Sequence, residues 1–260
     1  MNIYFIDTLE LTYSSDFDDI IKLTKNFKMV DPKKGAGNKE FISTELSGMG
    51  IIIKTRRSSK AELYKNSNKY KLVLKINPNK FYKPYMKTEH ISNIIEFCDM
   101  VERLDMQIQY CFSGLTIDDF EITRVDLTED IHGIPEDKIT QYIRIMRQLY
   151  LTLGFHHNKK LEENTEDFDP DSSFNAVNDS KKVEFVVYNK ARAAIDQDLT
   201  GTELEYYKNT MRLELRCYKS YIRKMAYETT TIEILCHMFE RRSYFIEREF
   251  YRIFDVEERT

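Results

Sequence analysis

Three short segments in the second half of the chain combine acids, bases and a tyrosine at alternating positions. They read ITRVDLTED from Ile122, VEFVVYNK from Val183 and MRLELRCY from Met211. Alternating apolar and polar residues predict strands, whose neighbouring side chains point to opposite faces. One face of each predicted strand is apolar, and the other could carry nucleophilic or metal-binding chemistry.

The polar faces of these three strands are predicted to form one shared surface. Its members are Arg124, Asp126, Thr128 and Asp130 on the first strand, Glu184, Tyr188 and Lys190 on the second, and Arg212, Glu214, Arg216 and Tyr218 on the third. Charge pairing across a solvated antiparallel sheet produces the same pattern. Residue types alone therefore leave a catalytic and a purely structural interpretation open.

The order of the motifs R-V-D, Y-N-K and R-L-E-L-R resembles the replication initiation factor family of rolling-circle plasmids and phages. The resemblance covers residues 121–224, and the first half of the chain is similar only in layout. It implies an endonuclease and ligase that nicks and rejoins one strand of origin DNA through a covalent 5′-phosphotyrosyl bond.

The resemblance also implies roles for single residues. Tyr188 corresponds to the nucleophile and Lys190 lies beside it, while Arg212 and Arg124 correspond to phosphate or structural partners. A tyrosine is mostly phenol at neutral pH, since its pKa is about 10. A lysine two residues on, about 7 Å along the same face, favours the phenolate. Tyr218 is the main competitor for the nucleophilic role.

A divalent metal is the second implication of the resemblance. Asp126 and Glu214 correspond to metal-site carboxylates, with Asp130 as a further candidate, and hard oxygen ligands suit Mg²⁺ or Mn²⁺. Such an ion polarises a phosphate oxygen and offsets charge in the transition state. Many related nickases use a histidine–apolar–histidine motif, which this chain lacks. His132 is the histidine best placed to join a metal site.

Two similar halves, residues 1–115 and 116–260, are predicted to position these strands. Each half follows a β-α-β-β-(β)-α order, which predicts an α+β fold with antiparallel sheets and helices packed on one face. In the first half, the predicted strands are Ile6–Tyr13, Gly48–Arg56, Ala61–Tyr64 and Lys69–Asn77, and the helices are Ser15–Phe27 and Thr88–Met106. In the second half, the strands are Glu121–Ile131, Lys182–Lys190 and Met211–Tyr218, and the helices are Pro135–Leu149 and Thr231–Phe254.

The charges are unevenly distributed, although the formal net charge is only −4. From Lys22 to Lys87 there are about seventeen basic residues against about four acids, which is typical of a phosphate-facing surface and also of a solvated face. We expect the first half to contact DNA, through Lys54, Arg56, Lys71, Lys75 and Arg124. Residues 159–180 are rich in acids, and we expect an acidic mobile loop there.

Composition and the remaining segments limit the other possibilities. No apolar run approaches the roughly 18 residues of a membrane helix, so we expect a cytoplasmic protein that acts away from the membrane. Expected partners are origin DNA, single-stranded or as a hairpin at the nick site, a host helicase and a second copy of the chain. The amphipathic segment Phe239–Phe254 could make the dimer contact or close its own domain. The alternative functions are a non-catalytic DNA-binding regulator, or decayed initiator, on the same fold and a protein-binding factor.

Overall fold

The computed structural model describes residues 2–30, 39–42, 44–57, 69–86, 88–157, 173–195, 199–225 and 230–255. These residues form a mixed fold of helices and antiparallel sheet, which confirms the predicted α+β class. The predicted strand Ala61–Tyr64 and the larger part of the predicted acidic loop lie outside the described residues.

The chain divides into two compact units, and neither is continuous in sequence. We call Met1–Ile6, Asp126–Met225 and Phe239–Thr260 the tyrosine unit, and Asp7–Val125 with Ala226–Met238 the basic unit. The boundary falls inside a strand, between Val125 and Asp126, whereas the sequence placed it after residue 115.

The basic unit is an antiparallel sheet with strand order β2-β3-β4-β5-β1. The strands are β1 (Asn2–Asp16), β2 (Lys28–Val30), β3 (Lys39–Ile42), β4 (Ile51–Arg57) and β5 (Lys69–Ile76). The helices are α1 (Phe17–Thr24), α2 (Thr44–Gly48), α4 (Pro78–Tyr82), α5 (Ile94–Cys111), the 3₁₀ turn η1 (Ile117–Asp119) and most of α11 (Thr231–Glu240). Leu9, Leu11, Leu72, Leu74 and Ile53 are each at most 1 % exposed and build the core on one sheet face.

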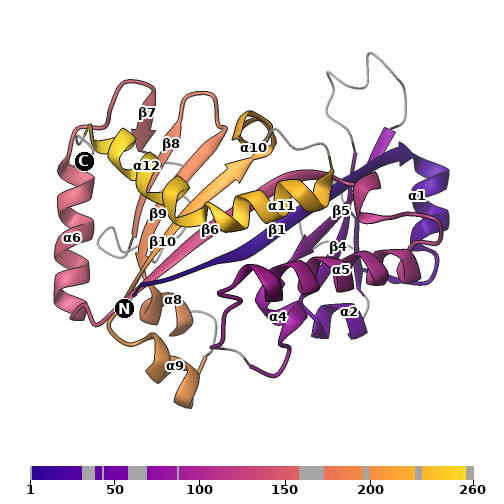
Figure 1. Ribbon diagram of the computed structural model, residues 1–260, viewed down its shortest axis with the longest axis horizontal. Helices are drawn as coiled ribbons and strands as arrows, with labels where there is room; N and C mark the ends of the chain where they lie inside the picture. The colour runs from indigo at the N-terminus through magenta and orange to yellow at the C-terminus, as the bar shows by residue number, and fades with distance from the viewer. Residues whose placement is uncertain are drawn as a thin grey trace. The chain divides into compact units, whose positions relative to one another are not determined.

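The tyrosine unit contains the strands β6-β10-β9-β8-β7, in that order. Their bounds are β6 (Glu121–His132), β7 (Phe155–His157), β8 (Ser173–Asn178), β9 (Val183–Asn189) and β10 (Thr210–Tyr218). The helices are α6 (Glu136–Gln148), α8 (Lys190–Ile195), α9 (Gly201–Tyr207), α10 (Lys219–Met225) and α12 (Arg242–Phe254), and Figure 1 shows α12 crossing the strands.

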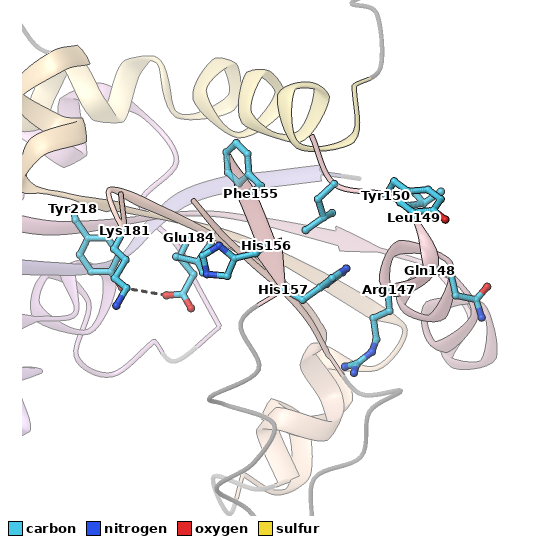
Figure 2. Close-up of a pocket in the computed structure, with 12 residues that line it drawn as sticks. Arg147, Gln148, Leu149, Tyr150, Phe155, His156, His157, Lys181, Glu184 and Tyr218 are labelled. Carbon is cyan, nitrogen blue, oxygen red and sulfur yellow. Dashed lines mark hydrogen bonds between the residues drawn. The ribbon is translucent and has the colours of Figure 1, made fainter. Parts of the chain in front are cut away.

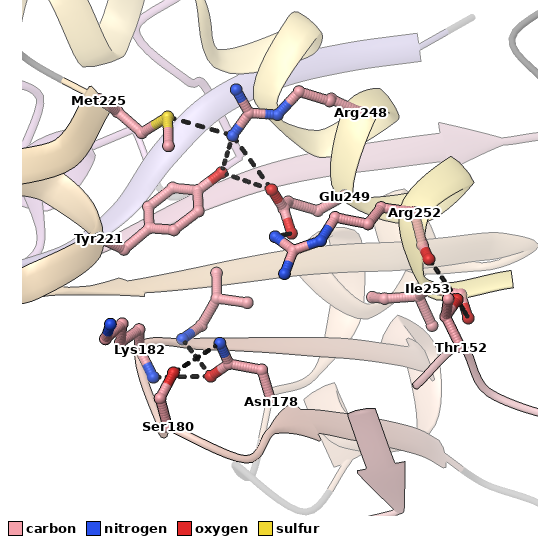
Figure 3. A network of polar contacts seen from close by, with 11 residues as sticks. Thr152, Asn178, Ser180, Lys182, Tyr221, Met225, Arg248, Glu249, Arg252 and Ile253 are labelled. Carbon is pink, nitrogen blue, oxygen red and sulfur yellow. Dashed lines mark hydrogen bonds and ion pairs between the residues drawn. The ribbon is translucent and has the colours of Figure 1, made fainter. Parts of the chain in front are cut away.

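Helix α12 covers the apolar face of the tyrosine unit. Phe250 packs on Phe185 and Phe254 on Phe174, with ring centroids 6.0 and 5.5 Å apart. Glu249, which is fully buried, accepts hydrogen bonds from Tyr221 of α10 and from Arg248 and Arg252 of α12 (Figure 3). The apolar side of the C-terminal segment therefore closes its own unit, which is the second of the two roles expected for it.

Several predicted helix ends were wrong, and local hydrogen bonds explain the differences. Helix α5 begins at Ile94 because Asn93 caps it, accepting a hydrogen bond from the Glu96 amide at 2.9 Å. Helix α1 has Asp16 rather than Ser15 at its N-cap. The predicted long C-terminal helix breaks at Arg241, where Arg242 turns back to donate to the Phe239 carbonyl at 2.6 Å.

Three short strands and one longer strand were missed. Strands β2, β3 and β7 have three or four residues each, too few for an alternating pattern to show. Strand β8, Ser173–Asn178, occupies part of the predicted acidic loop and pairs with β9. That part of the loop prediction was wrong, because Phe174, Ala176 and Asn178 alternate into the buried face. No helix in the described part of the chain is long and apolar enough to span a bilayer.

Candidate active site

Tyr188 lies on the polar face of β9, as the alternating pattern predicted. Strands β9 and β10 are antiparallel, with Tyr188 opposite Arg212 and Val186 opposite Glu214. The Tyr188 hydroxyl donates a hydrogen bond of 2.5 Å to Oε1 of Glu214, which lies two residues beyond the one opposite Tyr188. Tyr188 itself is partly exposed.

A chain of polar contacts continues from this pair along the two strands. Oε2 of Glu214 accepts from Arg216 at 3.1 Å, and Arg216 donates to Glu184 at 3.3 Å. The far end is Tyr218, whose hydroxyl donates to Glu184 at 3.1 Å. We call Tyr188, Glu214, Arg216, Glu184 and Tyr218 the strand-face network.

Asp126 of β6 adds a third carboxylate to the network. Burial lowers the pKa of the Arg216 guanidinium, but the charges of Glu214, Glu184 and Asp126 outweigh it, so the pKa lies above its ordinary value. Arg212 of β10 contacts Asp130 of β6, and an antiparallel arrangement of these neighbouring strands therefore puts Asp126 beside Arg216. Three carboxylates thus face one guanidinium.

Arg212 and Asp130 form a buried ion pair at the other end of the polar face. The guanidinium donates from Nε and NH2 to the two oxygens of Asp130 at 2.6 and 2.7 Å. It also lies 5.2 Å from the ring centroid of Phe5 and 5.7 Å from that of Tyr207. Both charges have a partner inside the protein, so this arginine is well placed to hold the strands together.

Lys190 is buried and lies over the ring of Tyr207, as Arg212 does. It is 6 % exposed at the start of α8, and its Nζ lies 5.0 Å from the ring centroid of Tyr207. Helices α8 and α9 fill the connection between β9 and β10 and cover this end of the polar face. This part of the polar face is buried rather than solvated, since Arg212 is 2 % exposed and Glu214 is 5 % exposed.

The described residues contain no group of three histidine, cysteine, aspartate or glutamate side chains arranged to hold a metal ion. Both oxygens of Asp130 are engaged by Arg212. His132 hydrogen-bonds Thr210 through Nδ1 at 2.9 Å and packs edge-on against Tyr206. Of the expected ligands, Asp126 and Glu214 remain on the face that carries Tyr188.

A buried hydroxyl marks unfilled hydrogen-bonding capacity on this face. Among the described residues, Oγ1 of Thr128, which is fully buried, has no hydrogen-bond partner, and Nε of Arg216 likewise has none. Thr128 lies between Asp126 and Asp130 on the same face of β6. Buried polar atoms of this kind are usually satisfied by water or an ion.

Four of the five expected DNA-contacting residues share one face of the basic unit. Lys71 lies opposite Arg56, and Lys75 lies opposite Ile52, two residues before Lys54. Arg56 is half exposed and pairs with Glu10 at 3.6 Å. Arg124 points to the other face, since its neighbour Thr123 contacts Glu10. We call Lys54, Arg56, Lys71 and Lys75 the basic face.

Comparison with known proteins assigns the chain to a family. The family model for the N-terminal region of a phage replication-associated protein matches residues 17–238. The match covers well over half of the chain, and the protein belongs to this family of replication-associated proteins. The membership confirms the resemblance to replication proteins that the three strand motifs indicated.

Similarity to individual proteins is weaker. No curated protein matches the sequence. One similar solved structure is a rolling circle replication initiator protein from Geobacillus stearothermophilus. It is 9 % identical in sequence, the match covers 91 % of this chain and 79 % of that one, and the TM-score is 0.43.

Proposed function

We propose that the protein is a rolling-circle replication initiator that nicks and rejoins one strand of its origin DNA through Tyr188. The observation that carries this proposal is the 2.5 Å hydrogen bond from the Tyr188 hydroxyl to Glu214, in a chain of the replication-associated family. A carboxylate in this position can accept the phenolic proton as the oxygen attacks.

The proposed reaction exchanges one phosphate ester for another. The phenolic oxygen of Tyr188 attacks the scissile phosphorus, and the bond from phosphorus to the 3′ oxygen breaks. The 3′ oxygen leaves as a hydroxyl, and the 5′ end stays on the tyrosine as a phosphodiester. Attack by a 3′ hydroxyl on that diester reverses the step and reseals the strand without ATP.

The neighbours of Tyr188 have supporting roles in this proposal. Arg216 holds Oε2 of Glu214, which keeps Oε1 directed at the tyrosine. Lys190 begins the helix after β9, and in this proposal its positive charge favours the phenolate. We expect Lys190→Ala to slow adduct formation by roughly 10²-fold.

We also propose that a magnesium or manganese ion assists the reaction. Such ions are usually held by one or two carboxylates together with substrate phosphates and water, so a three-ligand protein cage is not required. Asp126 and Glu214 would hold the ion, beside the unpartnered Thr128 hydroxyl. A carboxylate offers about four acceptor positions, of which Tyr188 and Arg216 take two on Glu214. A bound ion would supply a Lewis acid for a phosphate oxygen.

A covalent-adduct assay tests the nucleophile. Wild-type protein, Mn²⁺ and a single-stranded oligonucleotide carrying the cognate origin should yield a protein–DNA adduct that survives a denaturing gel. Tyr188→Phe should fold and bind the oligonucleotide but form no adduct, because phenylalanine keeps the shape of the side chain and lacks the oxygen. Tyr110→Phe, at an 81 % exposed position on α5, is the control and should form the adduct normally.

Peptide mapping of the adduct identifies the attacking residue. A DNA-linked peptide containing Tyr218 would move the reaction to the other end of the strand-face network. An authentic origin that gives no adduct on any tyrosine would favour the alternative function, a non-catalytic DNA-binding regulator.

The proposal also includes a host helicase to unwind the nicked duplex, a homodimer, and action in the cytoplasm.

A further inference from the structure

A groove opens on the same face of the tyrosine unit as the strand-face network. Its volume is about 1190 Å³, and its walls are the end of α6 with the segment after it and the strands β7 to β9. Figure 2 shows Lys181, Glu184 and Tyr218 at one end and Arg147 with Tyr150 at the other. The residues His156 and His157 lie between the two ends.

The groove is continuous with the residues around the proposed nucleophile. Glu184 and Tyr218 line it and are also the last two members of the strand-face network. Glu184 precedes Tyr188 by four residues on β9, so the two side chains share a face and are separated by about 13 Å along the strand. An extended polymer bound in the groove would therefore point toward Tyr188.

The lining matches the chemistry of unpaired nucleotides. Tyr150 is 98 % exposed and Leu149 is 44 % exposed, so an aromatic ring and an apolar side chain are available to contact bases. Arg147, Lys181 and His156 carry groups of the kind that bind phosphate. Arg147 also donates to the Ser173 carbonyl at 3.2 Å, and Nδ1 of His156 lies 3.0 Å from Oδ1 of Asp179. Among the described lining residues the one acid is Glu184, which is already hydrogen-bonded to Arg216, Tyr218 and Asn175.

Both walls of the groove are held by hydrogen bonds. Lys181 sits in the β8–β9 turn with φ of 51°, and Asn178 fixes this turn by accepting from the amides of Lys182 and Val183 at 2.7 and 3.1 Å (Figure 3). On the other side, Thr152 follows Tyr150 by two residues, and its amide donates to the Ile253 carbonyl of α12 at 3.0 Å.

We propose that this groove binds the unpaired nucleotides that flank the nick site, with one base stacked on Tyr150 and a phosphate held by Lys181. The inference rests on the proposed function, because it assigns the groove to the same DNA strand that Tyr188 attacks. Stacking on an exposed ring requires a base that is free of its complement, so the groove selects single-stranded over duplex DNA.

The test uses fluorescein-labelled oligothymidine without origin sequence and without divalent metal, so that binding is measured apart from nicking. Fluorescence anisotropy should show that Tyr150→Ala raises the Kd at least about fivefold for the single strand. Lys181→Ala should reduce the slope of log K against log salt by about 0.7, the value for one phosphate contact on a single strand. Tyr110→Ala, at another exposed tyrosine on α5, is the matched control and should bind like the wild type.

The outcomes separate this inference from the proposed function. An unchanged Kd for Tyr150→Ala, an unchanged salt slope for Lys181→Ala, an equal loss of affinity in Tyr110→Ala, or no binding of oligothymidine by the wild type would each overturn the groove. Loss of affinity confined to the two groove variants supports it, even if origin DNA forms no adduct. An adduct on Tyr188 with normal oligothymidine binding by Tyr150→Ala would support the nickase and reject the groove.

Discussion

The buried ion pair between Arg212 and Asp130 predicts a large and specific loss of stability. The two side chains are 3 % and 0 % exposed and share two hydrogen bonds of 2.6 and 2.7 Å. Arg212→Met removes the guanidinium but keeps much of the apolar stem that lies by Phe5 and Tyr207. The buried Asp130 carboxylate would then lose the guanidinium that donates to both of its oxygens.

The expected size follows from that uncompensated charge. Removing one partner of a buried pair typically lowers the free energy of unfolding by about 3–5 kcal/mol, against a total of about 5–15 kcal/mol for a whole domain. Arg212→Lys keeps the charge but loses the planar two-point contact, so its loss should be smaller. The double variant Arg212→Met with Asp130→Asn should be more stable than the sum of the single losses predicts, since neither residue of the pair is then left as an uncompensated buried charge.

Urea unfolding followed by far-ultraviolet circular dichroism measures these losses, since the chain has no tryptophan to report by fluorescence. The pair Arg103–Asp99 on α5 is a matched control, because Arg103 also lies 4.9 Å from a tyrosine ring centroid and its side chain is 53 % exposed. Arg103→Met should have a much smaller effect. If Arg212→Met unfolds like the wild type yet forms no adduct, Arg212 binds the scissile phosphate and the structural argument is wrong.

Three further predictions concern the metal, the DNA surface and pH. Calorimetric titration should show Mn²⁺ binding that Glu214→Gln weakens, and equal binding by both proteins would place the ion elsewhere. Charge reversal at Lys54 and Lys71 should lower DNA affinity and its salt dependence by roughly one power of salt per lost phosphate contact, and an unchanged slope would remove the DNA path from the basic face. Burial, with the charges of Glu247 and Asp130, raises the pKa of Glu129 above the ordinary 4.5. The native state then binds more protons than the unfolded state above pH 4.5, so stability falls as pH rises through the raised pKa. From about pH 4 to about pH 8, the unfolding free energy of Glu129→Gln should therefore rise relative to that of the wild type. A difference that stays constant with pH would contradict the pKa argument.

Alternation along the strands was enough to predict which side chains share a face. Tyr188, Glu214 and Arg216 were all placed on the polar face, and they contact one another there. Alternation does not indicate the register, which is the pairing of residues between two neighbouring strands. Whether Glu214 meets Tyr188 or Lys190 depends on the register in which β9 pairs with β10.

Burial of the polar face was not predictable from the same pattern. Polar residues alternating with apolar ones normally indicate a solvated face. Here Tyr207, from a short helix without a strong amphipathic pattern, covers Arg212 and Lys190. The pairing of Arg212 with Asp130 also depends on contacts between residues 82 positions apart, and no local signal reports them.

Helix faces were harder to predict than strand faces. On α5 Ile95 is 79 % exposed, whereas Phe97, Met100 and Leu104 are buried. Several apolar residues in one helix allow more than one stripe, and the choice depends on the position of the sheet. The helix break at Arg241 likewise had no glycine or proline to indicate it.

The discontinuity of the tyrosine unit has a consequence for synthesis on the ribosome. The carbonyl of Tyr4 accepts a hydrogen bond from Arg242, and the side chain of Asn2 donates to Glu129, across separations of 238 and 127 residues. The first residues of β1 emerge early but have no native partners until much later, and α12 is translated after every strand that it covers. Long sequence separation slows folding, because loop closure must precede the contacts. The nascent chain is therefore expected to hold Tyr188 in an unfinished sheet until α12 has left the exit tunnel.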